Sequence, residues 1–574
     1  MKRKSAALTL AAILVFSACL SGCGNGGDSG SSQGTGESGS QGESSQGSGE
    51  QSRAPEENAD PLGKYDQEVK VTFFGAKNDS IKFNEGEDYY NNIWTQHYKE
   101  ALNVNTEYLW LVDASQYAQQ VAMAVTTKEL ADIMVFTVGD KNMQTLYEND
   151  QLQDLSEVYE KYASDLTKSI LSYDGGVGLS SCFDGDVMYA IPGTNPSTDS
   201  ANMLWIRKDW LDKSGKAFPT TMEELKELAK IFVEEDYDGA GAYGVAIYNE
   251  ILKNGQIGSL AGYFNGFYSY PQQWVKGSDG KLTYGGVSDT TREALSMLAD
   301  MYQEGLLDEE FTVKDGNAVA ADLTSGKVGI TFGPQWLPVW PLNQGVGTVE
   351  TYDWVSGALP TSDGNYCKPI VPIGVQNYYV VRKGYEHPEV LIKMLNLFVE
   401  DAFGSGDISY FVTTDRYQEP FKLAKVAVSQ PDKNIQIWKA INAAMNGDES
   451  LIAENAEAEQ NYLSIQQWLD NPVQENNQGW GYNTIFGIGG SIGVLNDYEE
   501  KGALIINEFY GPSTETMGTK MATLEKMQLE TYTAIITGEE DISAFDNFVS
   551  QWFNLGGQDI TDEVNAWYDS VHSN

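Results

Sequence analysis

The chain has 574 residues, with 37 lysines and arginines against 82 aspartates and glutamates, so its formal net charge at pH 7 is −45. Such a surplus of negative charge repels phosphate backbones and anionic lipid surfaces, so we expect no nucleic-acid partner. Hydrophobic residues make up 41% of the chain. The chain is longer than a domain with a single hydrophobic core usually is, which predicts at least two globular domains.

The N-terminal residues have the pattern of an export signal. Lys2-Arg3-Lys4 precedes an apolar stretch at residues 6–16, and Leu20-Ser21-Gly22-Cys23 follows at the cleavage position, similar to a bacterial lipobox. We therefore expect residues 1–22 to be a lipoprotein signal peptide and Cys23 to be the lipidated first residue of the mature protein. An ordinary secretory signal cut elsewhere is the alternative.

A flexible tether is predicted after this signal. Residues 24–60 contain ten glycines, nine serines and no hydrophobic residue larger than alanine. This composition cannot bury enough apolar surface to offset its conformational entropy, so we expect residues 23–60 to be a lipidated cysteine with a disordered tether. The signal's apolar stretch is too short for a stable membrane span. The folded part is then held by its lipid at the outer face of a bacterial cell membrane.

Predicted strands and helices alternate along the rest of the chain. Val69, Val71 and Phe73 alternate with polar positions and predict a first strand. The apolar run at residues 131–138 has the length of a strand buried on both faces of a sheet.

Later segments have the periodicity of amphipathic helices. Thr221 and Glu224 have capping-box spacing before an apolar face that reaches Phe232. Another helix is predicted to end at Gly305, and a further one to open at Pro388. Strands separated by helices indicate an α/β fold.

Cys182 and Cys367 are the cysteines beyond the signal region. In an oxidising compartment they could pair, but two isolated cysteines this far apart are as readily two buried free thiols. His97, His387 and His572 lie far apart in the sequence, and no Cys/His spacing indicates zinc. We expect no cofactor.

Several segments resemble the solute-binding lipoproteins of bacterial ABC importers, in the extracellular family 1 group and its LplA-like branch. They are DGDVMYAIP at 184–192, LWIRKDWL at 204–211, PTTMEELKELAKIF at 219–232, DGKL at 279–282, EGLLDEEF at 304–311 and GGQDITDEVNAWY at 556–568. One such segment alone is weak, but together they follow the family's order from about residue 65 to residue 570.

The resemblance implies an α/β, two-lobed periplasmic-binding-protein-like fold (type II) with hinge strands between the lobes. We expect lobe 1 at about 61–195 and 330–370, and lobe 2 at about 196–329 and 371–574, with hinge strands at 189–192 and 327–332. Open α/β sheets bind ligands at the carboxyl ends of their strands, and two facing edges form a cleft.

The function that the resemblance implies is capture of an extracellular carbohydrate and its delivery to the permease of an ABC transporter. A neutral oligosaccharide is expected, because the strong negative charge disfavours uronate-rich ligands. The protein is then expected to be a monomer and not an enzyme.

The best candidate for the binding site is Gly333-Pro334-Gln335-Trp336, after the predicted strand 328–332. It is similar to the strand-end segment whose tryptophan stacks on sugar in this family. An indole covers the C–H face of a pyranose while amides reach its hydroxyls, so Gln335, Trp336 and Trp340 are predicted ligand residues. The alternative places both rings in the lobe core.

Further candidates lie at other strand ends and in ring-rich loops. Each has a structural alternative, either as a helix cap or as a core residue. They are Asn78, Asp79 and Tyr89 after the first strand, Asp140 after the buried strand, and Trp274 and Trp480 beside glycines.

A calcium loop is present in many relatives after the position equivalent to Phe232. Here the segment begins Asp236-Tyr237-Asp238-Gly239-Ala240, where the family's asparagine is replaced and a later carboxylate is missing. Calcium takes six to eight oxygen ligands, so we expect no metal.

Other functions are less well supported by the sequence. Gly489-Gly490-Ser491-Ile492-Gly493 matches the nucleophile-elbow pattern, but His572 lies too close to the C-terminus to serve as a fixed base. A surface glycoside hydrolase would need a carboxylate pair that no spacing singles out. A peptide-binding lipoprotein of the same architecture and an adhesion protein are further alternatives.

Overall fold

The computed structural model describes residues 60–78, 81–173, 176–349, 351–412, 420–453 and 455–572. The predicted signal peptide, the lipidated Cys23, nearly all of the tether and the candidate Asp79 lie outside these residues. Among the described helices, none is both long and apolar enough to cross a bilayer.

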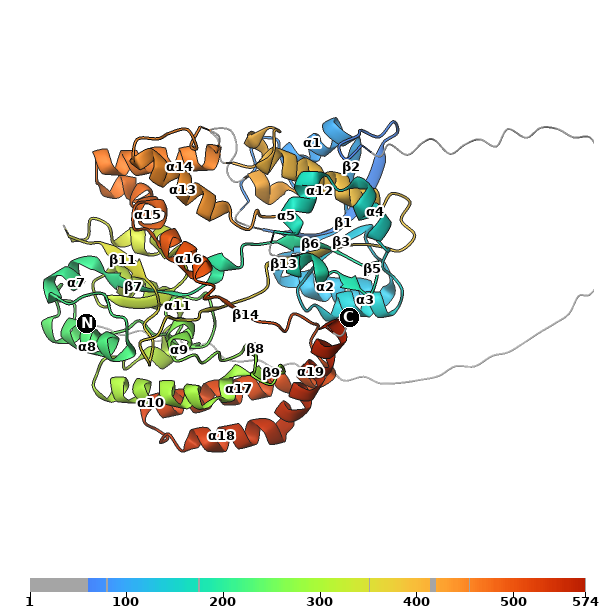
Figure 1. The fold of residues 1–574 in the computed structure, drawn as a ribbon. Coiled ribbons are helices and arrows are strands. Elements are labelled where there is room, and N and C mark those ends of the chain that lie inside the picture. The colour runs from blue at the N-terminus through green and yellow to red at the C-terminus, as the bar shows by residue number, and fades with distance from the viewer. Residues whose placement is uncertain are drawn as a thin grey trace, which may run out of the picture. The chain divides into compact units, whose positions relative to one another are not determined.

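The first hydrophobic core surrounds a five-stranded sheet with the order β2-β1-β3-β13-β6 (Figure 1). Its strands are β1 (Val69–Lys77), β2 (Val104–Asp113), β3 (Ile133–Thr137), β6 (Ile191–Thr194) and β13 (Val375–Val381). β2, β1 and β3 run parallel, whereas β13 is antiparallel to both β3 and β6. The predicted strands at 69–73 and 131–138 are confirmed as β1 and β3.

Short helices and one small hairpin complete this first lobe. They are α1 (Ile93–Leu102), α2 (Ala114–Thr127), α3 (Lys141–Glu148), α4 (Ser156–Tyr162), α5 (Asp165–Leu171), α6 (Val177–Ser180), α12 (Glu389–Phe403) and the β4 (Phe183–Asp184)–β5 (Val187–Met188) pair. α2 packs on β1 and β2, and α12 packs on α4 and α5. Pro388 precedes α12, as its position in the sequence predicted.

The second core contains a three-stranded sheet with the order β10-β7-β11, and most of the helices. Its strands are β7 (Met203–Arg207), β10 (Ile330–Gly333) and β11 (Trp354–Gly357), with the pairs β8 (Trp274–Lys276)–β9 (Leu282–Tyr284) and β12 (Ile370–Val371)–β14 (Ile505–Ile506) beside them. The helices are α7 (Lys208–Ser214), α8 (Met222–Glu235), α9 (Ala261–Gly266), α10 (Asp289–Gln303), α11 (Gly316–Thr324), α13 (Lys433–Met445), α14 (Ala456–Asp470), α15 (Asn477–Phe486), α16 (Ser491–Glu500), α17 (Glu515–Thr537), α18 (Ala544–Trp552) and α19 (Gln558–His572).

Local sequence signals fix the start of α8. The Thr221 side chain accepts from the Glu224 backbone N–H at 3.2 Å, and the Glu224 carboxylate accepts from the Thr221 backbone N–H at 3.2 Å. These two bonds form the predicted capping box. Five apolar residues of α8, among them Phe232, are buried in the second core.

The two cores divide the chain differently from the expected lobe boundaries. Residues 330–370, expected in lobe 1, belong to the second core because β10 pairs with β7. Residues 373–428, expected in lobe 2, belong to the first core because β13 pairs with β3. The chain therefore passes between the cores after β6, between β12 and β13, and between Val428 and Ile435, and the expected return strand at 327–332 lies wholly in the second lobe.

The two cysteines lie in separate cores. Cys182 is buried in the first core and Cys367 in the second, and both are free thiols. Of the two possibilities left open by the sequence, the structure has the unpaired one.

Candidate functional site

The edge of the second sheet carries the predicted strand-end segment. Gly333 of β10 pairs with Met203 of β7, so the residues that follow β10 lie next to Asn202, which precedes β7. The Trp205 indole N–H donates to the Pro334 carbonyl at 3.2 Å. The Ser491 hydroxyl, at the start of α16, donates to the Gln335 carbonyl at 3.0 Å. These bonds hold the segment in one conformation at the sheet edge.

The predicted rings of this segment differ in exposure. Trp336 is half-buried and packs against the second core, and Gln335 is buried. Trp340 is 41% exposed, and it is the only exposed tryptophan among the described residues. The ring of Trp340 is therefore more accessible to a ligand than that of Trp336, which packs against the core and is only partly exposed.

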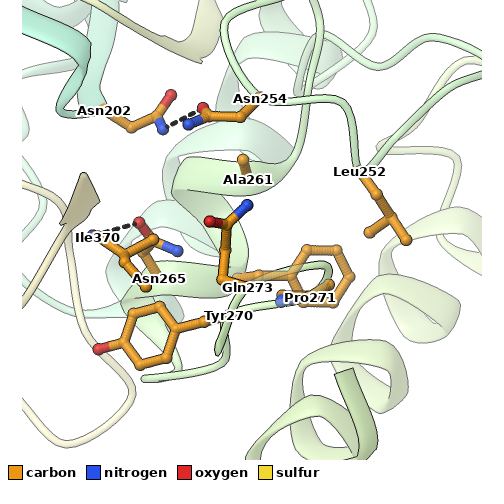
Figure 2. Close-up of a pocket in the computed structure, with 10 residues that line it drawn as sticks. Asn202, Leu252, Asn254, Ala261, Asn265, Tyr270, Pro271, Gln273 and Ile370 are labelled. Carbon is orange, nitrogen blue, oxygen red and sulfur yellow. Dashed lines mark hydrogen bonds between the residues drawn. The ribbon is translucent and has the colours of Figure 1, made fainter. Parts of the chain in front are cut away.

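A small pocket lies beside this edge, and amide side chains line it (Figure 2). Its polar lining consists of Asn202, Asn254, Asn265, Gln273 and Tyr270, and none of the described residues around it is charged. The Gly262 backbone joins the pocket to the sheet edge, since a Cβ at Gly262 would lie 3.0 Å from the side chains of both Asn202 and Phe332.

Hydrogen bonds orient the amides of this pocket. The Asn202 amide donates to Asn254 Oδ1 at 2.8 Å, and the Asn265 Oδ1 accepts from the Ile370 backbone N–H at 3.2 Å (Figure 2). An amide both donates and accepts, as a partner of sugar hydroxyls must. The sequence did not single out these amides, because single asparagines and glutamines spread over some 70 positions form no motif.

In the first lobe, the structure brings together two of the predicted residues after β1. The Asn78 backbone N–H donates to the Tyr89 hydroxyl at 2.8 Å, and that hydroxyl donates to the Asn78 carbonyl at 3.1 Å. The Tyr89 ring meets Phe83 edge-on, with centroids 4.9 Å apart. Asn78 is exposed and Tyr89 is half-buried.

Asp140 has the structural role that was weighed against binding. It is the N-cap of α3, and its carboxylate accepts from the Asn142 backbone N–H at 2.7 Å. Only part of its surface is accessible.

Trp274 and Trp480 lie in the second core, not at a surface that could receive a ligand. Trp274 is 4% exposed, and its ring packs edge-on against Tyr284. Trp480 is 3% exposed, and its indole N–H donates to Asp353 Oδ1 at 3.1 Å. The core alternative therefore describes both rings. Glycines beside an aromatic residue could not distinguish the two cases, because the glycines make room for close packing as well as for a ligand.

The carboxylates of the calcium-like segment are already used within the fold. Asp236 accepts backbone N–H groups from Ala240, Gly241 and Ala242 at 3.1–3.2 Å. Asp238 pairs with the buried Arg207 guanidinium at 3.0 Å. The Arg207 guanidinium also donates to Asp209 at 2.8 Å. The Arg207 guanidinium thus neutralises Asp238 and Asp209.

The nucleophile-elbow pattern carries no catalytic arrangement. Ser491 is fully buried, and its hydroxyl is engaged with the Gln335 carbonyl. His572 Nδ1 lies 2.9 Å from the Tyr568 carbonyl at the end of α19. Neither residue is placed to act on the other.

A second pocket lies where the chain passes between the cores. Tyr173 of the first lobe, Thr198 of the connection and Glu499 of α16 are among its lining residues. The Thr198 hydroxyl donates to Glu499 at 2.5 Å. Next to Thr198, burial raises the pKa of Asp199 to about 6, although Lys433 and Asn434 oppose this shift. No motif in the sequence predicts this acidic site.

Comparisons with known proteins agree with this architecture. The family model of bacterial extracellular solute-binding proteins matches residues 83–403, more than half of the chain. The fructooligosaccharide ABC transporter substrate-binding protein FusA of Streptococcus pneumoniae is 24% identical over 254 residues, which cover 42% of this chain and 46% of FusA. The match thus spans less than half of FusA. Lipoprotein LipO of Bacillus subtilis is 22% identical over 375 residues, 64% of this chain and 68% of LipO.

A solved structure shares the fold over nearly its whole length. The human-milk-oligosaccharide (HMO) binding solute-binding protein of Bifidobacterium longum infantis has a TM-score of 0.58 and 16% identity, covering 88% of this chain and 99% of that one. Its fold is the expected two-lobed α/β architecture. The chain belongs to the family of bacterial extracellular solute-binding proteins.

Proposed function

We propose that the protein is the substrate-binding component of an ABC importer and captures an extracellular oligosaccharide between its two lobes. The amide-lined pocket beside the strand end with Trp336 and Trp340 carries this proposal. Amides supply both donors and acceptors for hydroxyls, and an accessible indole covers a pyranose face. The names of the related proteins, which refer to fructooligosaccharide and HMO, support the same ligand class.

Lobe closure supplies the transport signal in this proposal. A ligand that contacts both lobes binds the closed state more tightly than the open one and so shifts the population toward closure. The permease then recognises the closed form. The protein acts as a monomer, and the diacylglyceryl group on Cys23 keeps it at the outer face of the membrane.

Thermal melting of the purified protein against neutral oligosaccharides, acidic oligosaccharides and peptides tests the ligand class. A ligand that binds only the folded state raises the melting temperature. We expect a shift with one or more oligosaccharides. A shift with peptides alone would replace carbohydrate by the peptide alternative, and hydrolysed sugar after long incubation would indicate a glycosidase.

A further inference from the structure

Lys425, in the first lobe, has an unusual environment for a cation. Its ammonium group donates to the Tyr108 hydroxyl and lies 3.8 Å from the centroid of the Tyr108 ring. Its backbone N–H donates to the Tyr98 hydroxyl at 3.2 Å. No carboxylate of the described residues forms an ion pair with it.

Two other lysines with little exposed side-chain surface have counter-charges. Lys314 pairs with both Asp308 and Asp322, and Lys433 pairs with Glu457 at 2.7 Å. Taking an ammonium out of water without an anion is costly, and burial lowers the pKa of Lys425 to about 7. A chain with 82 carboxylates could readily have supplied a partner here. The charge has no carboxylate partner among the described residues and is complementary to an anion from outside the chain.

Lys425 belongs to a cluster of tyrosines that extends to the candidate ligand residues after β1. The Tyr108 ring lies over Gly75 of β1, where a Cβ would come within 2.4 Å of it. Tyr90 meets the same ring edge-on, with centroids 5.6 Å apart, and is itself 60% exposed. The adjacent residue, Tyr89, is bonded to Asn78 at the end of β1.

We propose that Lys425 and Tyr108 form a subsite for a carboxylate of the ligand, so that the captured oligosaccharide contains a uronic acid. This inference rests on the proposed function and replaces the neutral ligand expected from the overall charge. The ammonium and the phenol each donate to the carboxylate, and the open Tyr90 ring lies beside them to pack on the pyranose. At physiological salt, screening limits the repulsion between a ligand carboxylate and the acids of the protein to about 8 Å. The local charge of Lys425 therefore determines whether this position attracts a carboxylate.

Two titratable groups contact Lys425, Tyr98 of α1 and Tyr108 of β2. Tyr89 and Tyr90 of the loop before α1 act on Tyr108, and Tyr379 of β13 and Asp401 of α12 act on Tyr98. Burial raises the pKa of both Tyr98 and Tyr108, so they stay neutral near pH 7. A bound carboxylate favours the charged ammonium. Binding of an acidic ligand therefore takes up a proton and weakens as the pH rises from about 6 to about 9.

Calorimetry with matched ligands tests this subsite. Oligomers of galacturonate, glucuronate and mannuronate are compared with their methyl esters, which keep the sugar and remove the charge. We expect at least one acid to bind the unmodified protein about tenfold or more tightly than its ester. Lys425→Met should remove this preference and leave the ester's affinity unchanged, whereas Lys425→Arg should retain most of it.

Tyr108→Phe, which removes one donor without removing the ring, provides a milder variant in case Lys425→Met folds poorly. It should weaken acid binding and spare ester binding. Equal affinity for acid and ester, unchanged acid binding by Lys425→Met, or binding of neutral oligosaccharides alone would overturn the subsite and leave the proposed function standing. Binding of no carbohydrate at all would instead overturn the proposed function as well.

Discussion

Gly333 pairs with Met203, and this antiparallel contact sets the position of the second lobe's candidate site edge. The pairing brings the segment after β10 next to Asn202, although more than a hundred residues separate them in the sequence. The start of the segment after β10 and the amide pocket lined by Asn202 therefore lie at the same sheet edge.

Trp340→Ala should weaken oligosaccharide binding about tenfold, because it removes an accessible ring, and should change the melting temperature little. Leu463→Ala, at an exposed position on α14, is the control and should affect neither quantity. Calorimetry and thermal melting measure the two effects. An unchanged affinity would remove Trp340 from the site.

Trp480→Ala should have the opposite profile. The ring is buried and its indole N–H bonds Asp353, so the variant should lose about 3–5 kcal/mol of unfolding free energy. Denaturant titration measures this loss. A Trp480→Ala protein of normal stability with weakened sugar binding would return Trp480 to the ligand site.

Asp199→Asn should stabilise the protein at neutral pH. The folded-state pKa of Asp199 is about 6, above its ordinary value of 3.8. Between these values the folded state holds a proton that the unfolded state has released, so this group's stabilisation is full below about pH 4 and is lost as the pH rises through 6. The variant should therefore gain roughly 1–2 kcal/mol over the unmodified protein between pH 4 and pH 7.

Urea unfolding across this pH range measures the effect of Asp199→Asn. Asp186→Asn, at an exposed position, is the matched control and should show no such trend. A stability difference that is flat with pH would mean that Asp199 titrates normally in the folded protein.

Reducing agent should leave the melting temperature of the folded protein unchanged, because Cys182 and Cys367 lie in separate cores as free thiols. Thiol titration should detect both only after denaturation, since both are buried. A lower melting temperature in dithiothreitol would instead indicate that the two cysteines pair.

Cys23→Ser should release the protein from membranes into the soluble fraction of expressing bacteria, if Cys23 carries the lipid anchor. Fractionation with an antibody measures this change. Cys182→Ser is the control, because Cys182 is buried in the first core. A membrane-bound Cys23→Ser protein would show that another segment provides the attachment.

Local features were predictable from the sequence, and non-local pairing was not. The α8 capping box was found because Thr221 and Glu224 bond each other within one helical turn. The lobe assignment of residues 330–370 was wrong because it depended on the partner of β10, which lies far away in the chain. Apolar patterns show that a strand is buried without showing in which core.

The site was predictable only where one segment carried it. The candidates Gln335 and Trp336 at one strand end, and Asn78 and Tyr89 after another strand, were named from continuous segments, and the bond between Asn78 and Tyr89 was not predicted. The amides of the pocket come from several loops. The role of Lys425 could not be predicted, because it depends on the residues that surround the side chain in the fold. Charge composition pointed toward neutral sugars, whereas the structure shows that Lys425 is shielded from water and forms no ion pair with a carboxylate of the described residues.

The central claim is that the protein captures an oligosaccharide between its lobes. Calorimetry of the purified protein with a panel of oligosaccharides, followed by small-angle X-ray scattering with the tightest ligand, tests it most directly. We predict saturable binding at one site and a smaller radius of gyration in the complex, because the ligand stabilises the closed state. Absence of binding to every oligosaccharide, together with binding of a peptide, would contradict the account.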